Sequence, residues 1–482
     1  MSARRLSRLL WALLLLSLPV TSFRYLPFLG SGTVVRPLAL YPLILLLPLL
    51  MLRLARREIK NLLPGPLTPL MAFLLAALLA TALGAFSAPI ELRGADYFER
   101  ALRAFLTLAI GLSFFLAALW MNQDEADLKF TVRWLMLGLA AQLLWGALQF
   151  VGLNTGHRAA LKQIQELFSV RGLVKNKRIS GFTFEPSWLA AQLATLYLPW
   201  LAAGLLGRWT EKAATGLARW LNLLLLLASL AALLATYSRS GLAITLFAAG
   251  IASLAAGRGV WRAAWGWFWG AFRRRENQSR LAAAQAAAGR FFLLLAAIGL
   301  LAGSSLFLAG KGYIARLWTS DFDSLWGYLV DVSLGPRVAY AQAGMAAFDR
   351  NPISGVGLGA SGFFIYPNLP DGVLMGVPEI AGALAPDSRL FPNPKNLIVR
   401  LLAETGLIGF SLFAAFWLSL LAEALALLRK SGSARALGLA GLFTLAALAL
   451  QAFSQDSLAL PELWLNLGVL AGLSANLMKK LE

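Results

Sequence analysis

The sequence LGPRVAYAQAGMAAFDRNPISGVGLGASGFF (residues 334–364) opens the largest polar insert of this chain, and FPNPKNLIVRLLAETGLIGF (residues 391–410) closes it. Long apolar segments flank the insert on both sides. Pro336 suits the first turn of a helix, and the pair Asn351-Pro352 disfavours its continuation. We therefore expect one helix from about Pro336 to Asn351, followed by a glycine-rich turn, within an otherwise hydrophobic protein.

The composition outside this insert is that of a membrane protein. The chain has 482 residues, of which 59% are hydrophobic and 14% are charged, and its mean hydropathy is +0.69. A soluble protein would carry roughly 25% charged residues. Apolar runs recur along the whole chain, and about 20 helical residues cross a bilayer. We therefore expect an all-α polytopic membrane protein, with residues 1–482 forming a single membrane domain.

The apolar runs predict about twelve transmembrane helices. Because no internal repeat is visible, we treat them as one unit. The large outer loop, residues 311–394, falls between the ninth and tenth of these helices. The predicted spans are 8–24, 36–54, 66–88, 101–121, 130–152, 186–206, 217–236, 240–256, 289–309, 396–427, 435–452 and 459–477.

Basic residues predict the orientation, because Lys and Arg are enriched in cytoplasmic loops. Residues 1–23 resemble a signal peptide, but without a clear cleavage site we expect a retained first helix and two cytoplasmic termini. The loop 257–288 is then a basic cytoplasmic loop, and its Trp residues indicate an interfacial helix or aromatic anchors. Residues 153–185 form a second outer loop. The acidic inner loop 122–129 is the one poor fit.

The same composition excludes several kinds of site. The net charge is +20, which the cytoplasmic loops of a membrane protein explain better than nucleic-acid binding does, because the basic residues are scattered among spans. The chain has no Cys, so it forms no disulfides, and one His, His157, so a His-cluster metal site is excluded. We expect no metal and no nucleic-acid partner.

Several basic residues fall on the predicted outer side, where the charge bias disfavours them. Their number indicates an anionic partner, although long loops escape the bias and solvated charge is the alternative. Arg239 lies within apolar sequence, where a charge usually faces a cavity, or else reaches the interface beside Tyr237. Arg337 begins the predicted helix and can bind phosphate oxygens, or else is a surface charge. The outer cations are Arg171, Lys175, Lys177, Arg178, Arg239, Arg316, Arg337, Arg350, Arg389 and Lys395.

Glu185 is a candidate general base, because it precedes the sixth span at the mouth of a possible membrane cavity. It can instead be a charge at a helix N-terminus or a salt-bridge partner of Arg178. The turn at Gly355 and Gly357 offers N–H groups that can bind a phosphate, but a tight connecting turn is the simpler interpretation.

The end of the insert adds three further polar residues. Lys395 and Asn396 precede the tenth span, and Lys395 can hold a phosphate or a sugar hydroxyl, or lie at the membrane interface. Glu404 lies near the start of the tenth span. We expect it to be structural and paired with Arg400, one helical turn before it.

Four segments, taken in order, resemble the family of O-antigen polymerases and O-antigen ligases. They are RISGFTFEPSWLA, ATYSRSGLAI, RVAYAQAGMAAFDRNPISGVGLG and PKNLIVRLLAETGLIG, and the resemblance covers about residues 130–430. It implies an inverting, metal-independent integral-membrane glycosyltransferase of the bacterial cytoplasmic membrane, without a cofactor. Such enzymes use an undecaprenyl-pyrophosphate-linked oligosaccharide as donor on the outer face of the membrane.

The resemblance also implies roles for individual residues. Arg239 and Arg337 match family arginines that would bind the donor pyrophosphate and stabilise its charge as it leaves. Arg178 and Lys395 would support them. Ligases of the family usually have a histidine where this chain has Pro394-Lys395-Asn396. This departure favours a polymerase with Glu185 as base.

Two alternatives to a polymerase stay open. A ligase would move the glycan to lipid A core or to a protein, and it shares nearly all of these residues. A transporter or flippase of lipid-linked oligosaccharide should show related halves and broken helices, and no related halves are visible in the sequence. Expected partners are membrane lipid and a chain-length regulator or other envelope-polysaccharide proteins.

Overall fold

The computed structural model describes residues 3–25, 34–59, 63–87, 91–173, 177–208, 216–270, 324–370, 377–385 and 390–479, with residues 89 and 388 and scattered positions between 281 and 322. The regular elements in these ranges are helices, joined by a few isolated β-bridges. Among the described residues, seven helices are long and apolar enough to cross a membrane. The prediction of a helical membrane protein is therefore confirmed.

Eleven of the predicted spans coincide with described helices, and the ninth, 289–309, lies mostly outside the described residues. The total of twelve spans therefore stays a prediction. The helices are α1 (Ala3–Ser17), α2 (Leu40–Ala55), α3 (Leu67–Gly84), α4 (Tyr97–Met121), α5 (Glu125–Asn154), α7 (Pro186–Gln192), the π-helix η2 (Leu193–Tyr197), α8 (Leu198–Arg208), α9 (Gly216–Ala235), α10 (Arg239–Trp269), α17 (Leu397–Leu428), α18 (Gly432–Gln451) and α19 (Pro461–Lys479).

Two helix ends differ from the prediction. The first helix ends at Ser17 rather than near residue 24, because Pro19 lacks the N–H that would continue it. The chain beyond it turns, and Ser22 then bridges to Arg36. At the other extreme, α10 continues to Trp269 after a break at Gly257, whose φ is 80°. The first part of the predicted loop 257–288 is therefore helical, and residues 271–280 lie outside the described part.

The centre of the bundle is an aromatic cluster. Trp464 of α19 is fully buried and contacts the rings of Phe115, Phe413 and Phe416. Its indole Nε1 donates a hydrogen bond of 2.8 Å to the carbonyl of Leu458. Buried aromatic side chains contribute large apolar area, and an indole N–H inside a core needs an acceptor. The cluster therefore fixes α4, α17 and α19 together and holds the loop before α19.

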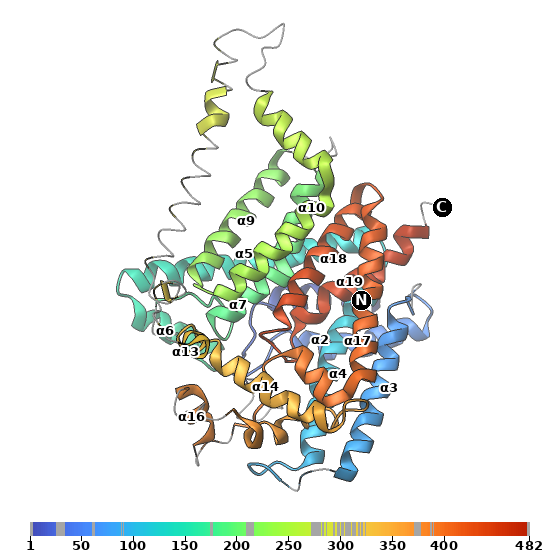
Figure 1. Cartoon of the computed structure of the whole chain (residues 1–482). Helices are drawn as coiled ribbons and strands as arrows, with labels where there is room; N and C mark the ends of the chain where they lie inside the picture. The colour runs from blue at the N-terminus through green and yellow to red at the C-terminus, as the bar shows by residue number, and fades with distance from the viewer. Residues whose placement is uncertain are drawn as a thin grey trace.

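The polar insert folds into short helices at one end of the bundle (Figure 1). They are α13 (Leu325–Asp331), α14 (Gly335–Arg350), η3 (Ser361–Phe364), η4 (Tyr366–Asn368) and α16 (Pro378–Leu384). The helix expected between Pro336 and Asn351 is therefore confirmed as α14. The other predicted outer loop, 153–185, contains α6 (Arg158–Phe168).

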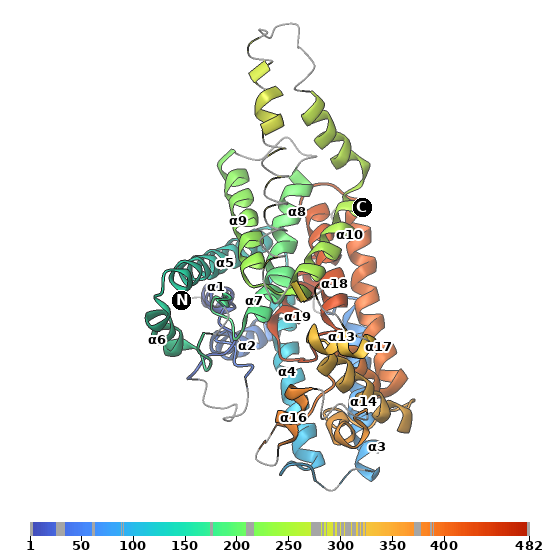
Figure 2. The same ribbon diagram turned by 60° about the vertical axis from the view of Figure 1, so that its left-hand side comes forward.

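The two ends of the bundle differ in the segments that they carry. The second half of α10 projects from the end opposite α14 and α16, as the two views in Figures 1 and 2 agree. Its Trp261 and Trp265 are exposed. The predicted topology requires the loop 257–288 and the polar insert to lie at opposite ends of the bundle. Which of the two ends faces the cytoplasm stays a prediction.

Candidate functional site

A cavity of about 50 Å³ lies where α7, α10, α14, α18 and α19 meet. A cavity that holds one water molecule has a volume of roughly 10–15 Å³, so this cavity has room for a few waters or for small reacting groups. Two of the predicted catalytic residues, Glu185 and Arg337, line it together. The third, Arg239, directly precedes a lining residue. The lining consists of Glu185, Ser187, Trp188, Ala191, Ser240, Gly241, Ile244, Arg337, Gln451, Ser454, Gln455 and Glu462.

Glu185 precedes Pro186, which begins α7, and its carboxylate is already bound on both oxygens. Arg171 Nη1 donates to Oε2 over 2.9 Å, and the Ser187 hydroxyl donates to Oε1. The ion-pair partner of Glu185 is thus Arg171 and not the alternative, Arg178, whose Nε donates to the carbonyl of Thr236 over 2.7 Å. Glu185 is thus placed at the cavity with each carboxylate oxygen already accepting one hydrogen bond.

Buried glutamine amides hold the loop that carries Glu185. Gln149 Oε1 accepts from the N–H groups of Ser180 at 3.0 Å and Gly181 at 2.8 Å. Gln142 Oε1 accepts from the N–H of Phe182 at 2.9 Å. Because unpaired buried N–H groups are costly, these contacts specify one path for the loop. They fix the position from which Glu185 reaches the cavity.

Two of the predicted arginines, Arg239 and Arg337, lie at the N-terminal ends of helices next to the cavity. Arg337 lies in the first turn of α14 and lines the cavity, whereas Arg239 is the first residue of α10. The Arg239 guanidinium donates to the carbonyl of Val332, just before α14. Arg178 binds the turn that precedes Arg239, where Tyr237 has φ 47°. The structure therefore brings Arg337 to the cavity wall and leaves Arg239 and Arg178 in contacts that position α10.

Lys395 and Asn396 do not line this cavity. The Lys395 ammonium pairs with Glu379 and lies 4.7 Å from the centre of the Tyr340 ring. Burial raises the pKa of Tyr340 to about 12, so its hydroxyl stays neutral at physiological pH. The Asn396 side chain caps α17 by accepting from the N–H of Val399 over 3.1 Å. Their local contacts link the insert to α17.

The glycine-rich turn packs against a break in α17. Gly406, with φ 61° and ψ −169°, interrupts the helix, and the turn pairs with its two halves. Val356 N–H donates to the carbonyl of Ala403 over 2.9 Å, and Gly357 N–H donates to that of Glu404 over 3.0 Å. Gly355 N–H donates within the turn. These N–H groups are satisfied by the protein, so we leave both turn glycines out of the proposed substrate contacts.

A buried charge network continues from this break. Arg400 Nε and Glu404 Oε2 are 3.0 Å apart, which confirms the expected pair, and Ser361 donates to Glu404 Oε1 over 2.8 Å. Arg400 Nη1 also donates to the carbonyl of Asp456 over 2.7 Å, and Asp456 Oδ2 accepts from the N–H of Lys395 over 3.0 Å. Burial raises the pKa of Asp456. The network ties the start of α17 to the loop 452–460.

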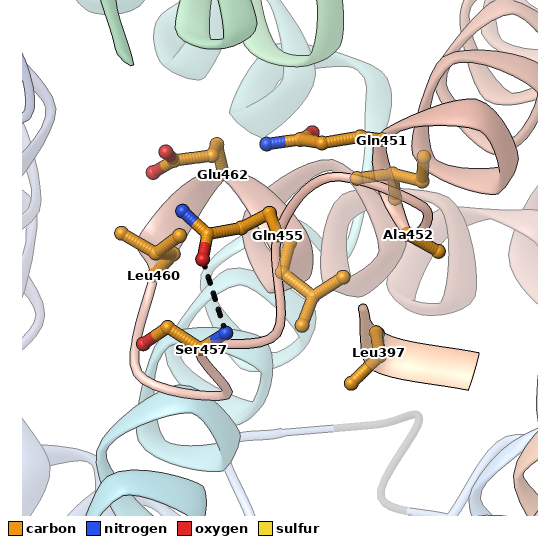
Figure 3. A pocket seen from close by; sticks show the side chains of 9 residues that line it. Leu397, Gln451, Ala452, Gln455, Ser457, Leu460 and Glu462 are labelled. Atoms are coloured by element: carbon orange, nitrogen blue, oxygen red, sulfur yellow. Dashed lines mark hydrogen bonds between the residues drawn. The ribbon is translucent and has the colours of Figure 1, made fainter. Parts of the chain in front are cut away.

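This loop and the helix ends on either side of it carry polar residues that the sequence analysis missed. Gln451, Gln455 and Glu462 line both this cavity and a smaller one beside Leu397 (Figure 3). Glu462 lies in the first turn of α19 and is 2% exposed. One signal could have found it, because Pro461-Glu462 starts an apolar span as Glu185-Pro186 does. The glutamines carried no such signal.

Comparison with known proteins does not identify the chain. No protein-family model matches it, and no curated protein is significantly similar to it. Among the residues that the structure describes, no three His, Asp or Glu side chains group closely enough to hold a metal ion.

Proposed function

We propose that this chain is an integral-membrane glycosyltransferase that joins undecaprenyl-pyrophosphate-linked oligosaccharide repeats into a polysaccharide. One observation carries the proposal: a cavity between membrane helices is lined by an arginine, Arg337, and by carboxylates from two other helices, Glu185 and Glu462. Transfer from a pyrophosphate lipid needs a cation at the leaving group and an acceptor for the proton of the attacking hydroxyl. The family resemblance predicts the same reaction.

In this proposal Arg337 binds the donor pyrophosphate, because the guanidinium fork matches phosphate oxygens and stays charged. Arg239 and Arg178 hold the end of α10 beside it, and Lys395 and Asn396 fix the insert through α17. The cavity's volume suits the reacting atoms rather than whole sugars, so the glycans extend outside it. The reaction takes place on the outer face of the bacterial cytoplasmic membrane, and a chain-length regulator is a candidate partner.

A ligase is the alternative within the same chemistry. It would use the same donor site and would differ in the acceptor, which would be lipid A core or a protein. The sequence Pro394-Lys395-Asn396 stands where ligases usually have a histidine. Lys395 is paired with Glu379 and lies outside the cavity lining, which makes it a poor substitute for that histidine. These observations favour the polymerase.

One observation favours a transporter or flippase as the second candidate. The span α17 is interrupted at Gly406 beside the buried Arg400–Glu404 pair, and transporters often place broken helices and polar groups within the bilayer. A coupled transporter would move lipid-linked oligosaccharide across vesicles only with an ion gradient. A glycosyltransferase would make product without one.

The test uses purified protein in proteoliposomes with undecaprenyl-pyrophosphate-linked repeats as the sole substrate. A ladder of products with repeat-unit spacing is expected. Arg337→Ala should lower its rate about 100-fold or more, since one group that stabilises transition-state charge contributes about that much. Arg350→Ala is the matched control, because Arg350 ends the same helix and is exposed.

Each other outcome has a distinct meaning. Product that forms only after lipid A core or protein is added would establish a ligase. A ladder that is unchanged in both Arg337→Ala and Arg239→Ala would refute the assignment of the donor site. Gradient-dependent movement of the substrate without any new glycosidic bond would establish a transporter.

A further inference from the structure

Glu462 and Gln451 share a property that separates them from the other polar residues of the cavity. Glu462 Oε2 and Gln451 Oε1 are buried, and neither has a hydrogen-bond partner within the part of the chain that the structure describes. The two side chains are 2% and 6% exposed. A buried acceptor without a donor destabilises the folded protein, and more so when it is charged. The two oxygens are therefore ready to receive a ligand that donates hydrogen bonds.

Both side chains line two adjoining cavities, so they stand at the junction between them. In Figure 3 the side chains of Glu462, Gln455 and Gln451 are seen together at the smaller cavity, with Leu397 and Leu460 completing its apolar wall. The smaller cavity, about 10 Å³, has room for about one water or one hydroxyl group. The larger one is lined in part by Arg337.

A simpler reading of Glu462 is a charge that stabilises the N-terminus of α19. That reading explains its position in the helix but leaves Oε2 without a donor. It also does not account for Gln451 Oε1, a second buried oxygen without a partner among the described residues, whose side chain ends a different helix and lines the same two cavities. Two unpaired acceptors from α18 and α19 in one cavity indicate a binding site rather than a helix cap.

We propose that Glu462 and Gln451 form a hydroxyl-binding subsite that takes the attacking hydroxyl of the acceptor sugar. This inference rests on the proposed function. Glu462, rather than Glu185, then accepts the proton, because both oxygens of Glu185 already accept hydrogen bonds from Arg171 and Ser187. As the hydroxyl oxygen bonds to the anomeric carbon of the donor, its proton passes to Glu462 Oε2. The bond from that carbon to the pyrophosphate oxygen breaks, and its electron pair leaves with the pyrophosphate beside Arg337.

The experiment measures turnover and binding on the same purified full-length protein. Glu462→Gln should lower ladder formation at saturating substrate by about 100-fold, the usual contribution of a general base. Binding is measured with undecaprenyl-pyrophosphate-linked repeats and with bare undecaprenyl pyrophosphate. Wild type should prefer the glycosylated lipid, and Gln451→Leu should weaken that preference about tenfold, as the loss of one buried hydrogen bond predicts.

Glu423→Gln is the matched control. Glu423 is a partly buried carboxylate of α17 that accepts a hydrogen bond of 2.6 Å from Ser474 and lies outside both cavity linings. It should behave as wild type in both measurements. Size-exclusion profiles and melting temperatures verify that each variant is folded, and Gln451→Leu tests the subsite should Glu462→Gln fail to fold.

The two ways of failing are distinguishable. A wild-type protein that makes no product in any arm refutes the proposed function, while the binding measurement still tests the subsite. Turnover of Glu462→Gln within threefold of wild type overturns the assignment of the base. A wild-type protein without preference for the glycosylated lipid, or a Gln451→Leu variant with unchanged preference, overturns the subsite.

Discussion

Replacing Gly406 by Ala should disrupt the packing of the glycine-rich turn against the break in α17 and so destabilise the protein. At φ 61° and ψ −169° the residue occupies a backbone region that only glycine adopts readily, at a cost of about 1–3 kcal/mol for other residues. An added Cβ would lie 2.2 Å from the carbonyl oxygen of Ile353 and 2.7 Å from the nitrogen of Gly355. Both neighbours are backbone atoms, so the turn itself must move.

Movement of the turn would weaken the hydrogen bonds that hold it. Leu407 N–H donates to the carbonyl of Pro352 over 2.8 Å, and Val356 N–H donates to that of Ala403 over 2.9 Å. Each such bond contributes about 1 kcal/mol. With the backbone strain, the expected loss in the free energy of unfolding is roughly 3–5 kcal/mol.

Thermal unfolding in detergent, followed by size-exclusion chromatography, measures this loss. Gly250→Ala is the matched control, because Gly250 lies in α10 with no atom within 4 Å of an added Cβ. A helix-interior alanine there should stabilise the protein by up to about 1 kcal/mol. If Gly406→Ala melts within a degree of wild type, then position 406 does not require glycine, and the reasoning is refuted.

Three further predictions concern the buried charge network beside Gly406. Glu404→Gln should cost roughly 3–5 kcal/mol in unfolding free energy, because it leaves the buried Arg400 without its counter-charge; a melting temperature equal to that of wild type would contradict this. Lys395→Met should change the free energy of unfolding by less than about 1 kcal/mol, since the ion pair of Lys395 with Glu379 is partly exposed. If the variant is equally stable but forms the product ladder more slowly, Lys395 contacts the substrate. Asp456→Asn should remove a pH dependence of stability. Burial raises the pKa of Asp456, so the folded protein holds this proton more tightly than the unfolded chain, and wild type should gain stability as pH falls through the raised pKa toward 3.8. Melting temperatures measured at several pH values should show that gain in wild type and not in the variant.

The sequence was informative where the physics is local. Apolar runs of bilayer length predicted the helical membrane class, because an unpaired backbone cannot lie in lipid. Proline placed α14 correctly, since the ring both suits a first turn and stops a helix before it. The pair Arg400–Glu404 was also expected, because residues four apart share one helix face.

Sequence failed where a residue's role depends on distant segments. A salt bridge with Arg178 was one alternative for Glu185, but the loop turns so that Arg171 pairs with it. The turn glycines were candidates for phosphate binding, yet Gly355 packs closely against the backbone beside Gly406, and Gly357 packs against Tyr97 and Thr81. Neither contact follows from spacing along the chain.

The sequence by itself determined the membrane class, the position of the polar insert and the basic and acidic residues available for chemistry, because hydrophobicity and helix length act over neighbouring residues. Only the tertiary structure decided which of these residues share a cavity. Helices α7 and α14 are far from each other and from the consecutive helices α18 and α19 in the sequence, and packing sets Glu185, Arg337, Gln451 and Glu462 around one space. Burial, which leaves an acceptor oxygen of Glu462 without a partner among the described residues, is likewise a property of that packing.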